Sequence, residues 1–172
     1  MGFFLILFML LVAYYMRKDT MILASNAFNQ NEMIPKKYTC QGENISPGLK
    51  LPIMSDKAKT IALIMDDPDA PSGTFVHWVL YNMPAYNFEI DENFPKKEKL
   101  IDGTLQGKND FDDIGYDGPC PPPGSTHRYY FKVYGVDKFL DLPAGATKKQ
   151  LEAAMKGHIV EQAELIGLYR KS

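Results

Sequence analysis

Several familiar site chemistries are absent from this chain of 172 residues. Its two cysteines form no C-x-x-C pair, and it has neither the H-E-x-x-H segment of many zinc enzymes nor the G-x-S-x-G segment of many serine hydrolases. The segment Asp110-x-Asp112 resembles the start of a calcium loop, but Ile114 and Pro121 stand where that loop requires oxygen ligands. We therefore expect no metal and no other cofactor.

An excess of basic charge is absent as well. The 19 Lys and Arg residues are outnumbered by 21 Asp and Glu residues, which gives a net charge of −2, and the lysine pairs are scattered along the chain. Domains that bind nucleic acid usually carry a clustered basic surface, so we expect no nucleic-acid partner. A charged fraction of 23% with 45% apolar residues is typical of a soluble globular domain.

The first 20 residues differ from the rest of the chain. Phe3 to Tyr15 is an unbroken run of apolar and aromatic residues, followed by Arg17 and Lys18. The run is shorter than the ~17 residues that a membrane-spanning helix needs at least, and no small-residue cleavage site follows it. Three interpretations stay open for residues 1–20: an atypical signal or short membrane anchor, an upstream extension of a cytoplasmic protein that starts at Met21, or a part of the fold.

These interpretations decide the predicted localisation. The protein is either cytoplasmic, or membrane-anchored or exported through the N-terminal segment, and any membrane association would act through residues 3–15. An anchor followed by two basic residues favours a domain on the cytoplasmic side. Residues 21–172 are predicted to form one domain, because their length suits a single domain and no internal repeat interrupts them.

Strand-like segments dominate residues 21–172. Thr60 to Met65 is apolar on both faces and is predicted to be a central, doubly covered strand. Phe75 to Met83 and Tyr129 to Val136 are rich in aromatic and branched residues, and turn-rich loops separate these segments. The pattern predicts a mainly β domain of two packed antiparallel sheets.

Side-chain alternation assigns faces within the segment from Phe75 to Met83. A strand turns successive side chains to opposite faces. This period of two puts one set of side chains on one face: Phe75, His77, Val79 and Tyr81. It puts another set on the opposite face: Val76, Trp78 and Leu80.

One helix is predicted near the C-terminus. Thr147 and Gln150 form a capping-box pattern, and apolar or small residues recur at helical spacing from Leu151 to Ala163. His158 falls on the apolar side of this helix, where we expect a structural role. Leu165 to Tyr169 is then predicted to be a short closing strand that Gly167 interrupts.

Two proline-rich loops carry most of the polar candidates for a site. The first is Asp67-Pro68-Asp69-Ala70-Pro71, which leads to His77-Trp78, and the second is Gly118-Pro119-Cys120-Pro121-Pro122-Pro123-Gly124, which leads to His127-Arg128-Tyr129. Proline fixes φ and removes an amide donor, so both loops should be stiff. Stiff polar loops on a packed scaffold favour a pre-shaped pocket for a small polar ligand. From the residues alone, a turn-forming role for the aspartates and a buried structural role for His77 also stay open.

These loops resemble the two signature regions of the phosphatidylethanolamine-binding proteins, also called Raf kinase inhibitor proteins. Three further stretches resemble the bacterial branch of that family: Ile34-Pro35-Lys36-Lys37-Tyr38-Thr39-Cys40, Ile45-Ser46-Pro47, and Asn109-Asp110-Phe111 before Gly115-Tyr116. The resemblance runs from about Met21 to Arg170. It implies a β-sandwich of two antiparallel sheets with a few peripheral helices, one of them near the C-terminus.

The resemblance also implies a set of ligand-binding residues. The family places the equivalents of Asp67, Asp69, His77 and His127 at an anion-binding cavity, where Asp67 would orient a histidine. The second loop adds Gly118 and Cys120, whose amides are held in a fixed geometry that can bind an anion, and Pro121, which stiffens the loop and removes a donor. Tyr129 supplies a wall and a hydroxyl. We expect these residues to converge on one cavity.

The two cysteines lie in family-like motifs that flank the proposed cavity. We therefore expect Cys40 and Cys120 to be neighbours in space. In an oxidising compartment they would form a disulfide. In a reducing compartment they would be a redox pair beside the pocket.

The resemblance implies a non-enzymatic binding module for a phosphorylated head group, a phosphorylated residue or a small anion. Such a module could be regulatory, in the manner of a kinase inhibitor. Cys120 and the Y-T-C-Q-G segment depart from the eukaryotic pattern and weaken the case for kinase inhibition. One alternative is a hydrolase of a phosphoester or ester with Asp67, His77 and His127 as acid–base groups, near Ser72 or Ser125. Another is a membrane-tethered protein that works through its surface. A protein partner and a homodimer stay open.

Overall fold

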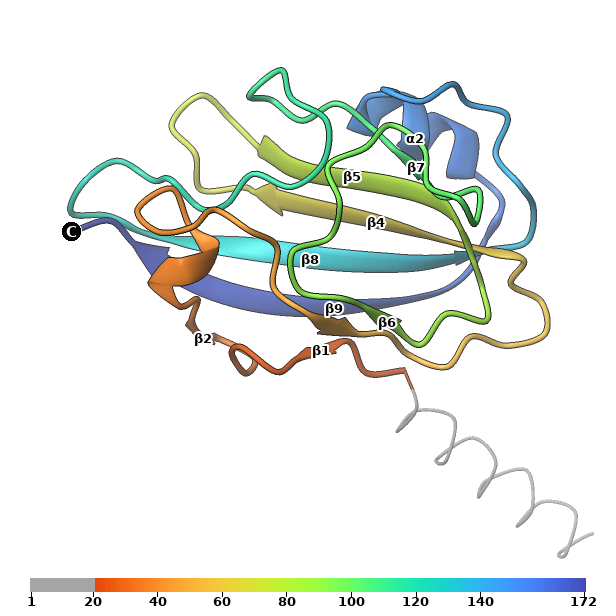
Figure 1. The fold of residues 1–172 in the computed structure, drawn as a ribbon, viewed down its shortest axis with the longest axis horizontal. Coiled ribbons are helices and arrows are strands. Elements are labelled where there is room, and N and C mark those ends of the chain that lie inside the picture. Colours follow the sequence, from red (N-terminus) through yellow and green to blue (C-terminus); the bar gives the residue numbers. More distant parts are fainter. Residues whose placement is uncertain (1–20) are drawn as a thin grey trace, which may run out of the picture.

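In the computed structural model, which describes residues 21–172, a six-stranded sheet carries a three-stranded sheet against one of its faces (Figure 1). The large sheet has the order β2-β9-β8-β4-β5-β7, with bounds β2 (Glu32–Met33), β4 (Thr60–Asp67), β5 (Phe75–Pro84), β7 (Leu105–Gln106), β8 (Thr126–Val136) and β9 (Ile159–Arg170). The small sheet has the order β1-β3-β6, with bounds β1 (Ala24–Ser25), β3 (Leu49–Lys50) and β6 (Glu89–Ile90). The helices are η1 (Lys36–Tyr38), a short 3-10 turn, and α2 (Lys148–Met155).

This architecture confirms the predicted fold class: mainly β, two sheets, and a helix near the C-terminus. The strand pairs are antiparallel except for β2 with β9, which run parallel. The segment from Thr60 to Met65 is the centre of β4, which is buried over its whole length as its apolar composition predicts. β4 lies between β5 and β8 in the large sheet.

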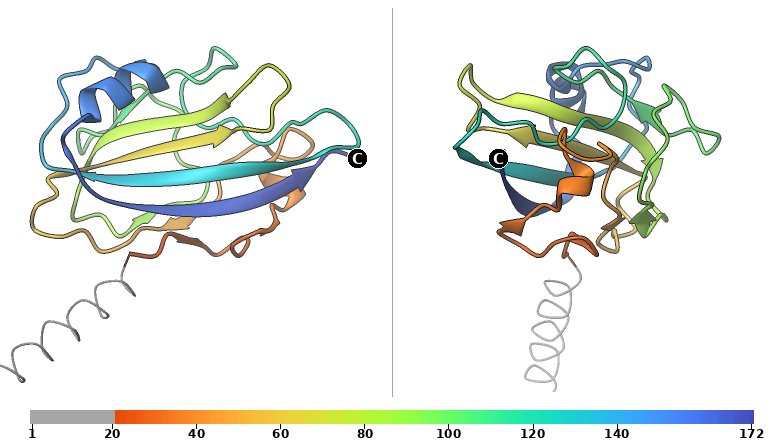
Figure 2. Two further views of the ribbon diagram at one scale, coloured as in Figure 1. Left: turned by 180° about the vertical axis from the view of Figure 1, so that it is seen from behind. Right: turned by 60° about the vertical axis from the view of Figure 1, so that its left-hand side comes forward.

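Two hydrophobic layers cover the faces of the large sheet. On one face, Leu49 and Ile90 of the small sheet pack with side chains of β4 and β8. On the other face, Leu151 and Met155 of α2 pack with side chains of β4 and β5. Figure 2 shows the helix and the small sheet on opposite sides of the large sheet. Double coverage leaves the ends of the strands, where the loops gather, as the places open to a ligand.

A β-bulge changes the predicted facing of His77. In the pairing of β5 with β4, Trp78 lies opposite Met65 and Val76 lies opposite Asp66, so His77 between them has no partner in β4. The ring centroid of His77 therefore lies 5.2 Å from that of Tyr129, whereas Val79 and Tyr81 point to the α2 side. The prediction that His77 shares a face with Val79 and Tyr81 is wrong, because an extra residue breaks strict alternation.

The C-terminal helix is shorter than predicted. The capping box forms as expected, with the Thr147 side chain accepting from the Gln150 amide and the Gln150 side chain accepting from the Thr147 amide. However, α2 ends at Met155. The prediction that the helix continues to Ala163 is wrong, because the residues from Ile159 onward belong to β9. Gly157 adopts a φ of +80°, the left-handed conformation that commonly ends helices. His158 follows this turn and lies outside the helix, with its Nδ1 2.9 Å from Asp137 Oδ1.

The last strand is longer than predicted, and Gly167 does not interrupt it. β9 runs unbroken through Gly167, which pairs with Glu32 of β2. A Cβ at this position would lie 2.5 Å from Ile34 Cγ1, closer than carbon atoms can approach. Glycine is therefore needed here so that the segment around β2 can pack on β9.

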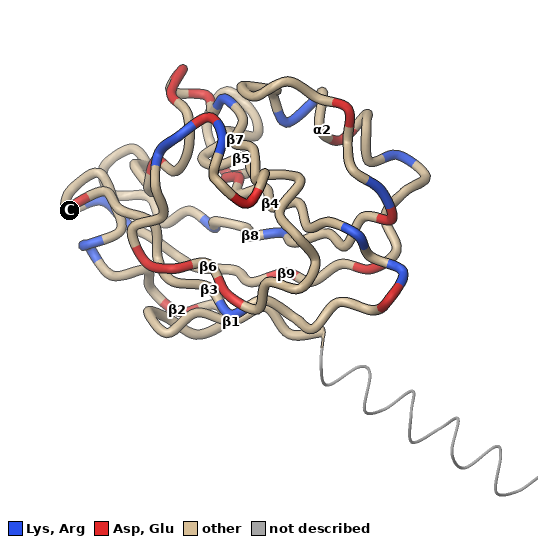
Figure 3. The backbone as a smooth tube through the Cα atoms, turned by 45° about the vertical axis from the view of Figure 1, so that its right-hand side comes forward, with Lys and Arg blue, Asp and Glu red and all other residues tan. Residues whose placement is uncertain are grey.

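Residues 1–20 lie outside the described part of the chain, so the interpretations of the apolar segment 3–15 stay predictions. Within residues 21–172, no helix combines the length and the apolar character needed to cross a membrane. Acidic and basic positions are interspersed along the tube in Figure 3.

Candidate functional site

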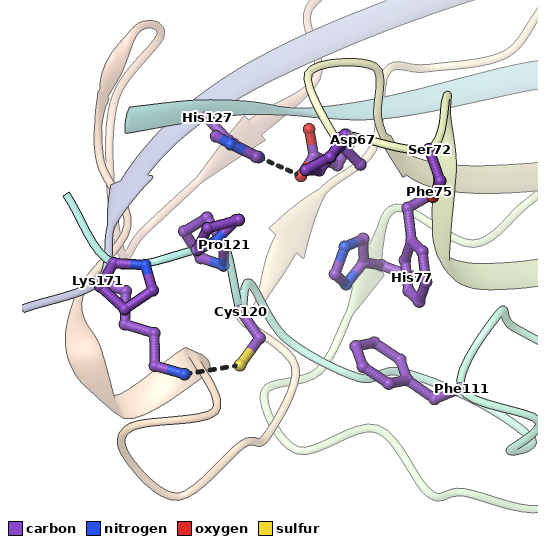
Figure 4. A pocket seen from close by; sticks show the side chains of 13 residues that line it. Asp67, Ser72, Phe75, His77, Phe111, Cys120, Pro121, His127 and Lys171 are labelled. Atoms are coloured by element: carbon purple, nitrogen blue, oxygen red, sulfur yellow. Dashed lines mark hydrogen bonds and ion pairs between the residues drawn. The ribbon is translucent and has the colours of Figure 1, made fainter. Parts of the chain in front are cut away.

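A pocket of about 430 Å³ opens at one end of the large sheet, where the two proline-rich loops meet (Figure 4). β4 ends here at Asp67, while β5 and β8 begin here with Phe75 and Thr126. The residues that line the pocket come from both loops and their neighbours: Asp67, Ala70, Pro71, Ser72, Phe75, His77, Phe111, Cys120, Pro121, Pro122, Pro123, His127 and Lys171. Five of the eight predicted ligand-binding residues are among them: Asp67, His77, Cys120, Pro121 and His127.

Asp67 holds His127 in the pocket wall. The Nδ1 atom of His127 lies 2.7 Å from Asp67 Oδ2, and both side chains are almost fully buried. The other carboxylate oxygen accepts a hydrogen bond of 2.8 Å from the Asp69 amide. The imidazole then directs its Nε2 toward Ser125 Oγ, 3.1 Å away. A carboxylate that orients an imidazole in this way fixes which ring nitrogen is offered to other groups.

His77 is held from the opposite side of the pocket. Its Nδ1 lies 2.7 Å from the backbone oxygen of Asp117, and a carbonyl oxygen can only accept. Nδ1 therefore carries the hydrogen, and Nε2 is the nitrogen that remains for a ligand. Burial lowers the pKa of His77 below its usual 6.5, against the opposing effect of the Asp117 hydrogen bond. The neutral ring is thus the form present at neutral pH.

Aromatic rings surround the His77 imidazole and fix its plane. The ring centroids of Phe75, Phe111 and Tyr129 lie 5.3, 5.5 and 5.2 Å from that of His77. Phe75 and Phe111 also contact each other edge to face, with centroids 4.8 Å apart. This half of the pocket is apolar, and it offers a surface for the hydrocarbon part of a ligand.

Tyr129 lies behind the wall and does not line the pocket. It is fully buried, and none of the described residues bonds its hydroxyl in good geometry. Burial first, and then the negative charge of Asp67, raise the pKa of Tyr129 far above its usual value. The hydroxyl is therefore a protonated donor close to Asp67.

Asp69 and Gly118 have other tasks than lining the pocket. The Asp69 carboxylate accepts from Arg128 Nη2 at 2.7 Å, from Arg128 Nε at 2.9 Å and from the Arg128 amide at 2.9 Å. This ion pair lowers the pKa of Asp69 to about 2. The Gly118 amide donates to Asn44 Oδ1 at 2.8 Å, and a Cβ on Gly118 would lie 2.1 Å from the Tyr38 oxygen. Both residues brace the loops and neither lines the pocket, so a direct contact of either with the ligand stays a prediction.

Asp117 is a support that the sequence reasoning missed. Besides holding His77 through its backbone, its carboxylate accepts from Asn44 at 3.0 Å, Lys96 at 2.8 Å and Asn109 at 2.8 Å. It thereby connects three segments that are distant in sequence. The position of Asp117 directly after the Gly115-Tyr116 motif is the feature of the sequence that could have identified it. Eight of the thirteen lining residues were also not predicted to bind the ligand, among them Phe75, Phe111 and Lys171, the last of which lies in no motif.

The two cysteines meet at the rim of the pocket. Cys40 and Cys120 form a disulfide with their Cα atoms 5.4 Å apart. Lys171 places its Nζ 3.7 Å from the Cys120 sulfur, and a dashed line marks this contact in Figure 4. Among the described residues, no three His, Cys, Asp or Glu side chains are arranged to hold a metal ion.

Comparison with known proteins extends these observations. A family model described as phosphatidylethanolamine-binding protein matches residues 24–170. A protein of Methanothermobacter thermautotrophicus named UPF0098 protein is 50% identical over 151 residues, which cover 88% of this chain and 99% of the relative. A UPF0098 protein of Aquifex aeolicus is 48% identical over 149 residues, which cover 86% of each chain. Archaeal as well as bacterial relatives are thus similar, so the resemblance is wider than a bacterial branch.

Two crystal structures share the fold. A phosphatidylethanolamine-binding protein homolog from Chlamydia trachomatis matches with a TM-score of 0.80 and 41% identity, over 87% of this chain and 97% of that chain. E. coli YbcL is described as a new member of the mammalian phosphatidylethanolamine-binding protein family. It matches with a TM-score of 0.81 and 26% identity, over 89% of this chain and 99% of that chain. Both matches span almost the whole described domain.

Proposed function

Because this chain belongs to the phosphatidylethanolamine-binding protein family, we propose that its pocket binds a phosphate-bearing group without turning it over. The group is a phosphorylated head group, a phosphorylated residue or a small free anion. The observation that carries the proposal is His77, whose Nδ1 is fixed by the Asp117 carbonyl while its Nε2 stays available in the pocket wall.

A phosphate monoester suits this histidine because its monoanion keeps one proton, which it can donate to the neutral ring at Nε2. The second pKa of a phosphate monoester is ~6, so one proton can be shared between a phosphate oxygen and His77 Nε2 near neutral pH. Lys171 adds a positive charge in the pocket wall.

Asp67 would repel an anion, but its hydrogen bonds reduce this effect. One carboxylate oxygen lies against His127 and the other accepts from the Asp69 amide. Both oxygens of the Asp67 carboxylate are thus hydrogen-bonded within the protein. The apolar rings of Phe75 and Phe111 line the other side of the pocket, which fits a ligand with a short hydrocarbon part next to its phosphate.

Calorimetric titration of the full chain with phosphoethanolamine and with inorganic phosphate tests this proposal. We expect saturable binding that falls at least tenfold in His77→Leu, which keeps the volume but removes the nitrogen. Lys108→Gln is the matched control, since Lys108 is paired with the exposed Asp112 and does not line the pocket. Equal affinity in the wild type and in His77→Leu would overturn the proposal.

A second candidate function rests on one further observation. Asp67, His127 and Ser125 form a chain, with 2.7 Å from Oδ2 to Nδ1 and 3.1 Å from Nε2 to Oγ. This order of groups is that of an activated serine in hydrolases, although Ser125 Oγ also donates to the Pro122 oxygen at 2.9 Å. Turnover of p-nitrophenyl acetate that disappears in both Ser125→Ala and His127→Gln would favour this candidate. Turnover that survives in Ser125→Ala, or no turnover at all, would reject it.

A further inference from the structure

The two cysteines of the Cys40–Cys120 disulfide differ in their exposure to solvent. Cys40 is exposed on the outer surface, whereas Cys120 is half-buried and lines the pocket. A small thiol can therefore approach Cys40 from outside without entering the pocket. Access of this kind is one of the factors that decide which sulfur of a disulfide is attacked.

A cation lies beside the sulfur of Cys120. Lys171 Nζ is 3.7 Å from the sulfur of Cys120, and a nearby cation stabilises a thiolate. The sulfur that is better stabilised as a thiolate is the better leaving group. The positive charge therefore favours attack on Cys40 with departure of Cys120.

The C-terminal segment is tied down so that Lys171 stays at this position. The Lys171 oxygen accepts from the Gly124 amide at 3.4 Å. The side chain of Gln41, the residue after Cys40, accepts from the Ser172 amide at 3.3 Å and from the Tyr169 hydroxyl at 2.6 Å. These contacts do not involve the disulfide, so they persist when it opens.

The two cysteine loops are also held together by other bonds. The Cys40 amide donates to the Pro119 oxygen at 3.2 Å, and the Tyr116 hydroxyl donates to the Tyr38 oxygen at 2.6 Å. A broken disulfide would therefore leave its sulfurs as neighbours. Groups held at such close range react with a high effective concentration, so the bond can close again readily.

We propose that Cys40–Cys120 is a redox-active disulfide that exchanges with low-molecular-weight thiols, with Cys40 as the attacked sulfur. The thiol loses its proton to solvent, and its thiolate bonds to Cys40 Sγ while the Cys40–Cys120 bond breaks. Cys120 leaves as a thiolate beside the Lys171 ammonium. Attack by the Cys120 thiolate on the mixed disulfide reverses the step. A second thiolate that attacks the small-molecule sulfur of the mixed disulfide instead releases Cys40 as a thiolate, so two thiols are oxidised and the protein disulfide is reduced.

The test uses the oxidised full chain under native conditions with reduced glutathione as the thiol. After acid quenching, peptide mass spectrometry should locate the glutathione adduct on Cys40 and a free thiol on Cys120. The exchange rate should fall at least threefold in Lys171→Met and recover in Lys171→Arg. Lys57→Met removes the same charge from an exposed lysine elsewhere and should leave the rate unchanged.

Thiolate formation gives a second measurement that does not depend on the exchange rate. The pKa of the Cys120 thiol in the reduced protein, followed by its alkylation rate against pH, should be higher in Lys171→Met than in Lys57→Met. Three results would overturn the proposal. These are a disulfide that reacts only after unfolding in urea, an adduct on Cys120, or equal rates in the two methionine variants.

Discussion

Lys148 Nζ of α2 lies 2.6 Å from Asp66 Oδ2 of β4, and this carboxylate has no exposed surface. Lys132 Nζ of β8 lies 2.7 Å from the other oxygen. One buried carboxylate thus joins the helix to two strands of the large sheet. Asp66 is followed directly by Asp67, and the two side chains point to opposite faces of the sheet. Asp66 binds Lys148 of the helix, and Asp67 binds the pocket residue His127.

Asp66→Asn should lower the free energy of unfolding by about 3 kcal/mol, the lower end of the cost of breaking a buried pair, because Lys132 loses its counter-charge and Lys148 keeps only the more distant Glu152 at 3.6 Å. Urea unfolding followed by circular dichroism measures the loss. Asp112→Asn is the control, since Asp112 is exposed and pairs with Lys108 on the surface, where such pairs contribute less than about 1 kcal/mol. Equal losses in the two variants would show that Asp66 has no special part in the fold.

The Asp69–Arg128 pair should contribute stability at neutral pH and lose it in acid. The pKa of Asp69 is about 2 in the folded protein, below its ordinary value of 3.8. The contribution is therefore complete above pH ~4 and falls as the pH drops toward 2. It should be about 1 kcal/mol or less, because the Arg128 side chain is half exposed. Unfolding curves of the wild type and Asp69→Asn should differ at pH 7 and converge near pH 2, and a difference that persists at pH 2 would contradict this origin.

Anion affinity should rise as the pH falls below 6.5. Burial lowers the pKa of His77 below 6.5, so the ring becomes a cationic donor only below that pH. This moves the transition below the interval of pH 6.5 to 8 that an ordinary histidine pKa would predict. Sulfate is a suitable probe, because its charge is constant in this range. Calorimetry between pH 5 and 8 should show the rise in the wild type and its loss in His77→Gln, whereas a flat wild-type profile would assign the binding to other groups.

Gly167→Ala should destabilise the protein by about 1–3 kcal/mol, the usual cost of overpacking. Its new Cβ would lie 2.5 Å from Ile34 Cγ1 and 2.8 Å from Phe28 Cε2. Gly48→Ala is the matched control, since its new Cβ would meet nothing closer than 3.5 Å. Thermal unfolding should show a lower midpoint for Gly167→Ala alone. A similar effect of both variants would mean that backbone freedom, and not the contact with Ile34, explains the loss.

Residue patterns located β4, β5 and β8, because burial on both faces of β4 and the run of aromatic and branched residues in β5 and β8 are visible in the order of residues. The two-residue strands carry too few residues for such a pattern and were not predicted. Residue patterns could not locate the bulge at His77, since an inserted residue depends on the pairing between two strands and leaves no mark in either strand alone. The bulge matters because it turns His77 to the face of Tyr129. Likewise, helical spacing up to Ala163 could not reveal that Gly157 adopts a left-handed conformation, which ends α2 and starts β9.

The pocket residues that lie in motifs could be predicted from the sequence for a different reason. Asp67, His77 and His127 lie where loops join strands, and their resemblance to a family added the evidence that they share a cavity. Lys171 comes from a segment without any motif and reaches the pocket only because β9 lies beside β8. Asp69 and Gly118 belong to the same motifs, yet their contacts with Arg128 and Asn44 depend on the tertiary structure.

The pairing of β2 with β9 has a consequence for synthesis on the ribosome. It joins Glu32 to Gly167 and Met33 to Leu168, so the large sheet closes only after almost the whole described chain has emerged. Until β9 is translated, β8 presents an open edge along most of its length, and open edges invite pairing with other nascent chains. Such distant contacts also make folding slow compared with a helical protein of the same size. The period before the last strand emerges is therefore when the unpaired edge of β8 is most open to association with other chains.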